Sequence, residues 1–221
     1  MTHQRMLDLL ADRIVALHTT HPLRVAIDGI DASGKTTLAD ELAPPLWARG
    51  RSVIRASVDG FHRPRAERYR RGADSPDGYY YDSFDYTAIR RDLLEPLGPH
   101  GSRRYRRAVF DLASDMPLLA SGELAPDDAI LLFDGVFLLR PELNALWEYR
   151  IFVEAPFAVA LQRAFVRDLP VLGTLDAVQA RYQRRYIPGQ RLYLEAAKPQ
   201  EIAQAIVHNA NPDQPDVVFR A

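Results

Sequence analysis

The stretch GIDASGKT, residues 29–36, decides the fold of this 221-residue chain. It matches the pattern Gly-x-x-x-x-Gly-Lys-(Ser/Thr) in full, with a short β-prone run (residues 23–27) before it and a helical pattern (residues 36–42) after it. A strand, a glycine turn and a helix in this order place backbone N–H groups and the positive end of the helix around phosphate oxygens. The segment therefore predicts a phosphate-binding loop, called the P-loop below.

The residue types in the P-loop suit a nucleoside triphosphate. Gly29 and Gly34 permit a close backbone approach and unusual dihedral angles. Lys35 places one mobile cation against the β- and γ-phosphates, and the Thr36 hydroxyl can ligate Mg²⁺. We expect the nucleotide-binding residues to be Gly29, Ala32, Ser33, Gly34, Lys35, Thr36 and Thr37. The motif alone does not separate a kinase from a GTPase or an ATPase.

The rest of the chain alternates apolar runs with helical patterns. Runs at residues 52–58, 129–133, 151–153 and 205–208 predict further strands. Helical patterns cover residues 6–18, 36–42 and 86–97, and Pro44-Pro45 is expected to end the second helix. Because such strands suit a buried parallel sheet, we expect an α/β fold with helices on both faces and a single domain over residues 1–221.

A segment of different composition separates the second and third predicted strands. Residues 63–81 are rich in Arg, Tyr, Gly, Asp and Pro, and residues 103–112 alternate enough to predict a β-hairpin. We interpret residues 60–115 as an insertion that projects over one edge of the sheet. Tyr79, Tyr80 and Tyr81 are read in two ways, as a stacking wall for a base or as core residues.

The composition narrows the function classes. With 28 Lys+Arg against 29 Asp+Glu, the net charge of −1 argues against a nucleic-acid partner bound through bulk charge. The absence of cysteine excludes disulfides, zinc–thiolate sites and cysteine nucleophiles. No apolar run approaches the roughly 20 residues that span a bilayer, and the N-terminus lacks a signal-peptide pattern. We expect a cytoplasmic protein without a membrane partner, and a homo-oligomer is left open.

Two aspartates follow predicted strands, at the sheet edge where ligands of open α/β sheets bind. Asp134 comes directly after the apolar run 129–133, where a carboxylate can hold the Mg²⁺ shell. Asp59 comes after the run 52–58, where it can accept the proton of a hydroxyl group that attacks the γ-phosphate. Both residues have a plainer interpretation as Asp-Gly turns.

Six motifs in order resemble the uridine kinase family of P-loop kinases, whose relatives include phosphoribulokinase and bacterial pantothenate kinase. They are DGIDASGKTT at residues 28–37, SVDGFH at 57–62, DSFD at 82–85, VFD at 109–111, FDGV at 133–136 and Arg-x-x-x-Arg-Asp at 163–168. The likeness runs from about residue 23 to residue 209. It implies a P-loop kinase fold with an inserted substrate-side hairpin and a short lid over residues 163–190.

The resemblance also implies an activity. It is the ATP-dependent phosphorylation of a hydroxyl group on a small molecule, with ATP and Mg²⁺ as cofactors and uridine or cytidine as the leading acceptor. Asp59 would be the base, Lys35, Arg163 and Arg167 would stabilise the transferred phosphoryl group, and Thr36 and Asp134 would hold the metal. The acceptor contacts would come from His62, Tyr81, Asp82 and Asp111.

Alternatives remain open on the acceptor side. Pantothenate, a sugar, a sugar phosphate and a nucleotide-dependent switch are the other interpretations. Where the family has further lid arginines, residues 169–174 are uncharged. Whether Arg181, Arg184 or Arg185 replaces those arginines is left open.

Overall fold

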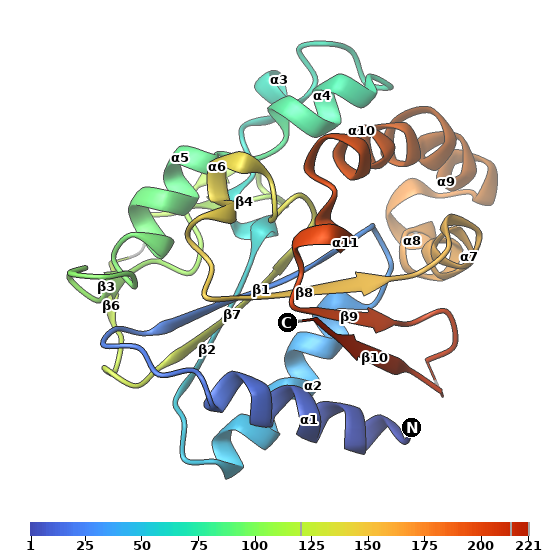
Figure 1. The fold of residues 1–221 in the computed structure, drawn as a ribbon. Helices are drawn as coiled ribbons and strands as arrows, with labels where there is room; N and C mark the ends of the chain where they lie inside the picture. The colour runs from blue at the N-terminus through green and yellow to red at the C-terminus, as the bar shows by residue number, and fades with distance from the viewer. Residues whose placement is uncertain (120, 213, 221) are drawn as a thin grey trace.

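A parallel sheet forms the centre of the molecule (Figure 1). The computed structural model describes residues 1–119, 121–212 and 214–220. Within them, the main sheet has six strands in the order β10-β9-β8-β1-β7-β2. Their bounds are β1 Leu23–Gly29, β2 Val53–Ser57, β7 Ile130–Gly135, β8 Tyr149–Glu154, β9 Ala205–His208 and β10 Asp216–Phe219. All neighbours pair in parallel except β10, an antiparallel edge strand that the sequence analysis did not predict.

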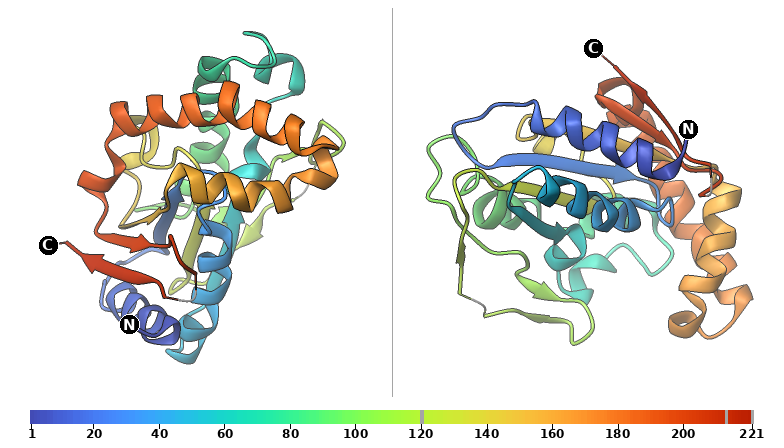
Figure 2. Two further views of the ribbon diagram at one scale, coloured as in Figure 1. Left: turned by 90° about the vertical axis from the view of Figure 1, so that its right-hand side faces the viewer. Right: turned by 90° about the horizontal axis from the view of Figure 1, so that it is seen from below.

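The central strands are apolar because their side chains pack into two hydrophobic clusters, one on each face of the sheet. On β1, Val25 and Ile27 pack with helices α1 (His3–Val15) and α2 (Lys35–Ala48), whereas Ala26 packs into the cluster on the opposite face. On β7, Leu132 and Phe133 alternate between the cores in the same way. Helices therefore cover both faces of the sheet (Figures 1 and 2), which confirms the predicted α/β fold.

Most of the remaining elements lie on the second face and beyond the carboxyl ends of the strands (Figure 2). The inserted segment contains η1 Val58–Phe61, α3 Arg65–Arg68, α4 Pro76–Asp82, α5 Tyr86–Ala88, the π-helix η2 Ile89–Leu94, β3 Arg104–Tyr105, β4 Phe110–Asp111, β5 Met116–Pro117 and β6 Glu123–Leu124. The later elements are α6 Pro141–Asn144, α7 Phe157–Arg167, α8 Leu169–Leu172, α9 Leu175–Arg181, the π-helix η3 Tyr182–Tyr186, α10 Ile187–Ala197 and α11 Pro199–Ile202.

Two local predictions were wrong. Helix α2 does not end before Pro44 but continues through both prolines to Ala48. Proline removes a backbone N–H from a helix, yet the flanking Leu42 and Leu46 are fully buried, and their packing holds this last part in helical form.

The predicted hairpin within residues 103–112 also differs. Strands β3 and β4 lie on the same arm, and they pair with β6 and β5 on the returning arm. The hairpin therefore reaches Leu124, beyond the expected boundary of the insertion at residue 115. The alternating pattern in residues 103–112 correctly predicted the first arm of the hairpin. The turn between the two arms lies further along the chain. Among the described residues, no helix combines the length and apolar character needed to cross a membrane.

Candidate active site

The P-loop connects β1 to α2, and its two glycines are required by geometry. Gly29 has φ +153° and Gly34 has φ +100°, both in the region that favours glycine. A Cβ at Gly29 would also collide with the carbonyl oxygen of Val153, and one at Gly34 with the side-chain amide of Asn209. The neighbouring strand β8 and the segment after β9 therefore leave room for a bare backbone only.

A cavity of about 240 Å³ lies against the P-loop. Its lining consists of Ala32, Gly34, Lys35, Thr36, Thr37, Arg163 and Arg167. The buried Lys35 ammonium donates to the carbonyl oxygen of Ile30 at 2.6 Å. Burial lowers the pKa of Lys35, while the carboxylates of Asp31, Asp28 and Asp134 oppose that change. The fold thus gathers three cations around one small space that is suited to an anion.

The two lid arginines are held differently. Arg163 donates to the carbonyl oxygens of Asn209 at 2.7 Å and Ser33 at 3.3 Å, so it braces the P-loop against the segment after β9. Arg167 donates to Asp168 at 2.6 Å and to the Tyr182 hydroxyl at 2.9 Å. Both arginines line the cavity of about 240 Å³ beside the P-loop, called the phosphate-side cavity below. Their four-residue spacing on one helix face allows this.

Hard oxygen donors meet beside the P-loop. The Thr36 hydroxyl donates to Asp134 Oδ2 at 2.7 Å, and Arg55 pairs with the other carboxylate oxygen at 3.0 Å. Within the residues that the structure describes, no cluster of three or more His, Cys, Asp or Glu could hold a metal. This donor set fits Mg²⁺, which usually takes one or two carboxylates and completes its shell with phosphate oxygens and water.

Asp59 follows β2 within the 3₁₀-helix η1, and its backbone N–H donates to Ser57 Oγ at 3.4 Å. The carboxyl group is 73% exposed, and the space between it and the P-loop is called the cleft below. Removal from bulk water in this cleft raises the pKa of Asp59, a nearby His62 opposes the rise, and Asp31 and Asp134 add to it. Asp59 lies two residues beyond Ser57, whose partner Asp134 on β7 binds Thr36, so Asp59 and the P-loop lie at the same edge of the sheet.

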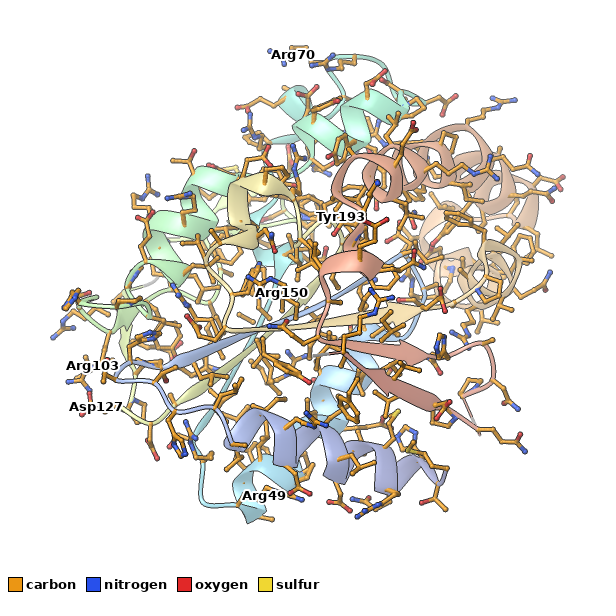
Figure 3. The ribbon with its side chains drawn as sticks, in the orientation of Figure 1. Arg49, Arg70, Arg103, Asp127, Arg150 and Tyr193 are labelled. Carbon is orange, nitrogen blue, oxygen red and sulfur yellow. The ribbon has the colours of Figure 1, made fainter. Side chains whose placement is uncertain are left out.

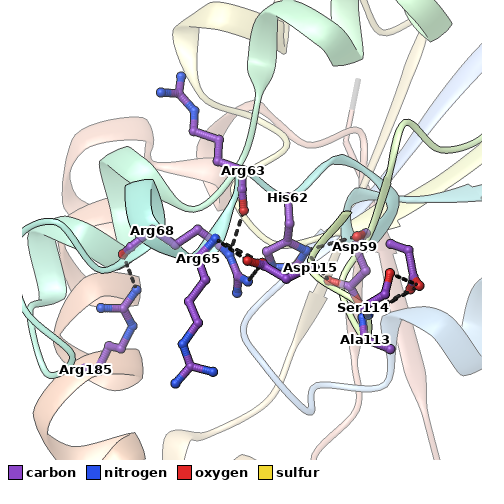
Figure 4. A network of polar contacts seen from close by, with 10 residues as sticks. Asp59, His62, Arg63, Arg65, Arg68, Ala113, Ser114, Asp115 and Arg185 are labelled. Atoms are coloured by element: carbon purple, nitrogen blue, oxygen red, sulfur yellow. Dashed lines mark hydrogen bonds and ion pairs between the residues drawn. The ribbon is translucent and has the colours of Figure 1, made fainter. Parts of the chain in front are cut away.

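His62 lies beside Asp59 in this cleft (Figure 4). Its Nδ1 is 3.0 Å from the carbonyl oxygen of Asp59 and 4.0 Å from the carboxylate, and its ring packs on Phe84 at 4.5 Å between centroids. Burial lowers the pKa of His62, against the opposing effect of Asp59. A neutral imidazole therefore stands next to the aspartate at neutral pH.

The hairpin tip approaches the same side of the cleft (Figure 4). Asp111 accepts hydrogen bonds from the N–H groups of Ala113 and Ser114 and from the Ser114 hydroxyl, so its carboxylate caps the tip of its own hairpin. Asp115 binds Arg68 at 2.8 Å and the N–H of Arg65. These contacts dock the hairpin on the segment after Asp59.

The structure does not bring Tyr81 and Asp82 to this cleft. The buried Asp82 pairs with Arg71 at 2.7 Å and Arg70 at 3.4 Å, and Arg70 lies at the far tip of the insertion (Figure 3). Tyr81 is 47% exposed, and its ring lies beneath the Arg71 and Arg140 guanidinium groups. Two residues along a helix turn a side chain to the opposite face, and in α4 it is Tyr79 that faces the P-loop.

Sequence reasoning missed the residues that surround Asp31 in the P-loop. The Tyr79 hydroxyl donates to Asp31 Oδ2 at 2.7 Å, and the Gln190 amide donates to the same oxygen at 2.9 Å. The Asp31 N–H donates a hydrogen bond to Gln190 Oε1 at 2.9 Å. The acidic residue inside the motif was visible in the sequence, but its partners lie 48 and 159 positions away.

The question of the later lid arginines has a structural answer. Arg185 is buried and donates to the carbonyl oxygens of Arg68 and Ser75, each at 3.1 Å. Arg181 donates to the carbonyl oxygen of Ala73 at 2.9 Å. Arg184 pairs with Asp74 at 3.6 Å. These three side chains bind the tip of the insertion and so join the lid to it.

A second and larger cavity, of about 600 Å³, adjoins the first. The two share Gly34, Thr37 and Arg163. Its other walls include Leu38, Val207, Asn209, Pro212, Pro215 and, from α1, His3 and Met6. A mostly apolar pocket with a few polar groups suits a flat base next to the phosphate-side cavity.

Beneath the P-loop, the Tyr193 hydroxyl donates to the fully buried carboxyl of Asp28 and accepts from the Leu139 N–H at 3.1 Å. Burial raises the pKa of Asp28 from 3.8 to about 6, and the bond from Tyr193 limits that rise. For an acid whose pKa is higher in the folded state, the stability gain is present at low pH and is lost as the pH rises toward 6.

We expect Tyr193→Phe to destabilise the protein by about 1–3 kcal/mol, because it leaves buried polar groups without a partner. The loss should be larger at pH 8, where Asp28 is ionised in the folded state, than at pH 4.5. The free energy of unfolding is measured in urea at pH 4.5 and at pH 8. Tyr81→Phe, at an exposed tyrosine, is the control. An equal loss at both pH values would contradict the link to Asp28.

Several curated proteins are similar to this chain in sequence. Uridine-cytidine kinase B of Dictyostelium discoideum is 26% identical over 186 residues, which are 82% of this chain and 73% of the relative. Further curated matches are named uridine kinase. No family model matches the chain.

Two solved structures share the whole fold. A structure described as a possible uridine kinase from Bacillus stearothermophilus has TM-score 0.72 and 25% identity, and the alignment covers 92% of this chain and 97% of that one. A Silicibacter sp. TM1040 protein, provisionally described as a fructose transport system kinase, has TM-score 0.73 and 28% identity, with 86% and 95% covered.

The parallel sheet, the P-loop and the carboxylates at its edge define a P-loop kinase, an enzyme that transfers phosphate to a hydroxyl group. The curated and structural relatives support this class, and among such kinases the chain is similar to proteins named uridine kinase.

Proposed function

We propose that this protein transfers the γ-phosphate of ATP to a hydroxyl group of a nucleoside, with uridine or cytidine as the acceptor. The observation that carries the proposal is the position of Asp59 at the sheet edge of the P-loop, two residues beyond Ser57, which pairs with the Thr36-bound Asp134. The curated relatives named uridine kinase support the nucleoside as acceptor.

ATP would occupy the two adjoining cavities. Its phosphates fit the space beside Lys35 and the P-loop N–H groups, and its base fits the larger pocket beyond Gly34. Thr36 and Asp134 are the residues that would hold Mg²⁺. When bound there, the metal ion would neutralise charge on the phosphate oxygens.

The chain's own residues supply the rest of the chemistry. Asp59 takes the proton of the acceptor hydroxyl as that oxygen attacks the γ-phosphorus. The bond from the γ-phosphorus to the bridging oxygen breaks, and ADP leaves with the electron pair. Lys35 and Arg167 stabilise the negative charge on the transferred group, and a catalytic site of this kind depends mainly on such positioned charge.

Two segments would enclose the acceptor. We assign the acceptor side to the insertion, here residues 60–124, and the lid to residues 163–190, within one kinase domain. The contacts of Arg185 and Arg181 with residues 68–75 support coupled movement of the two segments. Joint closure would exclude water and limit wasteful hydrolysis of ATP.

An acceptor panel tests the proposal. The protein is incubated with ATP, Mg²⁺ and one of uridine, cytidine, fructose, pantothenate or a sugar phosphate, and ADP release is followed. We expect release to depend on uridine or cytidine. ADP release that none of these compounds increases would contradict the nucleoside kinase.

A sugar is the second candidate acceptor. The Silicibacter protein described as a fructose transport system kinase shares 28% identity, slightly more than the curated nucleoside kinases reported above. A preference for fructose over both nucleosides in the panel would favour this alternative.

A further inference from the structure

Two lining residues of the larger cavity, His3 and Glu41, have no part in the chemistry described above. His3 is the first residue of helix α1, and Glu41 lies in the middle of α2. The two side chains meet, with His3 Nε2 at 2.8 Å from Glu41 Oε2. Because α1 precedes β1 and α2 follows the P-loop, this pair connects the segments on the two sides of the P-loop in one wall of the cavity.

The hydrophobic core sets the position of this pair. Helices α1 and α2 lie side by side on one face of the sheet (Figures 1 and 2), and Met6 of α1 packs in the same buried cluster as Leu38 of α2. Met6 comes three residues after His3, and Leu38 comes three residues before Glu41. Each polar side chain therefore lies within one helical turn of a buried apolar residue that fixes its helix.

The register of α2 places Glu41 at the base end of a bound nucleotide. Thr37 lines both adjoining cavities, whereas Glu41 lines only the larger of the two. Four residues separate them on one helix, so they share a face and lie about 6 Å apart along the helix axis. A nucleotide with its phosphates beside the P-loop therefore extends its base along α2 toward Glu41.

The lining of the larger cavity carries opposite charges at its two ends. Arg163 is shared with the phosphate-side cavity and donates to the carbonyl oxygen of Ser33 in the P-loop at 3.3 Å. Glu41 is the acidic residue of this lining, and within the described part of the chain only its Oε2 is paired, with His3. An ionised carboxylate accepts hydrogen bonds and repels phosphate, so the Glu41 end suits a hydrogen-bond donor of the base.

Purine bases differ in the group that they can present to this carboxylate. Adenine carries an amino group at C6, which donates hydrogen bonds, whereas guanine carries an oxygen there, which accepts them. A carboxylate therefore attracts the C6 edge of adenine and repels the C6 edge of guanine. The side chains of Glu41 and His3 are 41% and 39% exposed, so water and salt reduce the size of this effect.

We propose that Glu41 accepts a hydrogen bond from the 6-amino group of the bound nucleotide and so selects ATP over GTP as the phosphate donor. His3 is a positioning residue that holds the Glu41 carboxylate in the cavity wall. This inference rests on the proposed placement of ATP in the two cavities. It gives α1, which lies outside the six sequence motifs, a part in the choice of nucleotide.

Nucleotide binding without an acceptor tests this proposal separately from phosphate transfer. Calorimetric titration in the presence of Mg²⁺ measures Kd for ATP, for GTP and for purine riboside triphosphate, which has hydrogen in place of the 6-amino group. The variants are Glu41→Ala, Glu41→Gln and His3→Ala. Asp12→Asn is the control, because Asp12 is also on α1, lines neither cavity and changes the net charge by the same amount as Glu41→Ala.

The wild type should bind ATP about 5- to 20-fold more tightly than purine riboside triphosphate, near the lower end of the range for a hydrogen bond to a charged group. GTP should bind no more tightly than that analogue. Loss of the negative charge affects all three nucleotides, so the ratio of the Kd values is the deciding quantity. In Glu41→Ala the preference for ATP over the analogue should fall below about 2-fold.

The other variants separate the two residues. Glu41→Gln should keep part of the preference for ATP, because the amide oxygen still accepts a hydrogen bond. His3→Ala should reduce the preference although Glu41 is retained, and Asp12→Asn should leave it unchanged. An unchanged preference in His3→Ala would remove His3 from the positioning role.

The remaining outcomes distinguish this inference from the proposed function. A wild type that binds all three nucleotides equally, or a preference for ATP that survives in Glu41→Ala, would overturn the role of Glu41 and leave the kinase intact. The expected preference together with a failed acceptor panel would contradict the kinase alone. If the protein binds none of the three nucleotides, both proposals fail.

Discussion

Asp59→Asn should lower kcat by a factor on the order of 10²–10⁴ and leave the affinity for ATP nearly unchanged. The asparagine keeps the size of the side chain but cannot accept the proton of the acceptor hydroxyl. Asp59 lies on the acceptor side of the P-loop cavity and does not line it, so nucleotide binding should survive. Steady-state turnover and calorimetric titration with ATP measure the two quantities.

The pH profile sharpens this prediction. Because the pKa of Asp59 is raised, the base is protonated and inactive up to a higher pH than an ordinary aspartate. Turnover should therefore fall as the pH is lowered through that raised pKa. The residual turnover of Asp59→Asn should not show this fall at low pH. Asp127→Asn, beside Arg103 at the opposite end of the sheet (Figure 3), is the control. Full turnover in Asp59→Asn would remove the residue from the role of base.

Lys35→Ala should weaken ATP binding and transfer together, with kcat/KM for ATP lower by about 10²–10³-fold, typical for loss of one preorganised charge donor. Lys35 is one of three cationic side chains that line the phosphate-side cavity, and it is the buried one. The same kinetic and calorimetric measurements apply. Arg51→Ala, which removes a cation before β2 and far from the cleft, should behave as the wild type. Unchanged ATP affinity and rate in Lys35→Ala would contradict the assignment of the P-loop.

The sequence predicts those parts of the site whose geometry is local. A strand, a glycine turn and a helix place Lys35 and Thr36 within eight residues, and the ends of neighbouring parallel strands bring Asp134 beside them. Asp59 was predicted in the same way, from the end of β2. Such short-range rules need no knowledge of how distant segments pack.

The acceptor side could not be predicted in this way. Three consecutive tyrosines give no sign of which one faces the cleft, because the register of the short helix α4 depends on its packing with α10. The partners of Asp31 and the carbonyl groups bound by Arg185 are likewise set by contacts over more than 40 positions. Pro44 and Pro45 failed as helix terminators for a similar reason, since tertiary packing outweighed the local cost.

The most direct measurement follows the γ-phosphate itself. ATP labelled at the γ-position is incubated with the protein, Mg²⁺ and uridine, and the label is separated into nucleoside phosphate and inorganic phosphate. We expect label on the nucleoside in an amount equal to the ADP formed, and almost no ADP without uridine or another acceptor. Label that appears only as inorganic phosphate, at the same rate with and without any acceptor of the panel, would contradict a kinase whose P-loop and Asp59 act in one cleft.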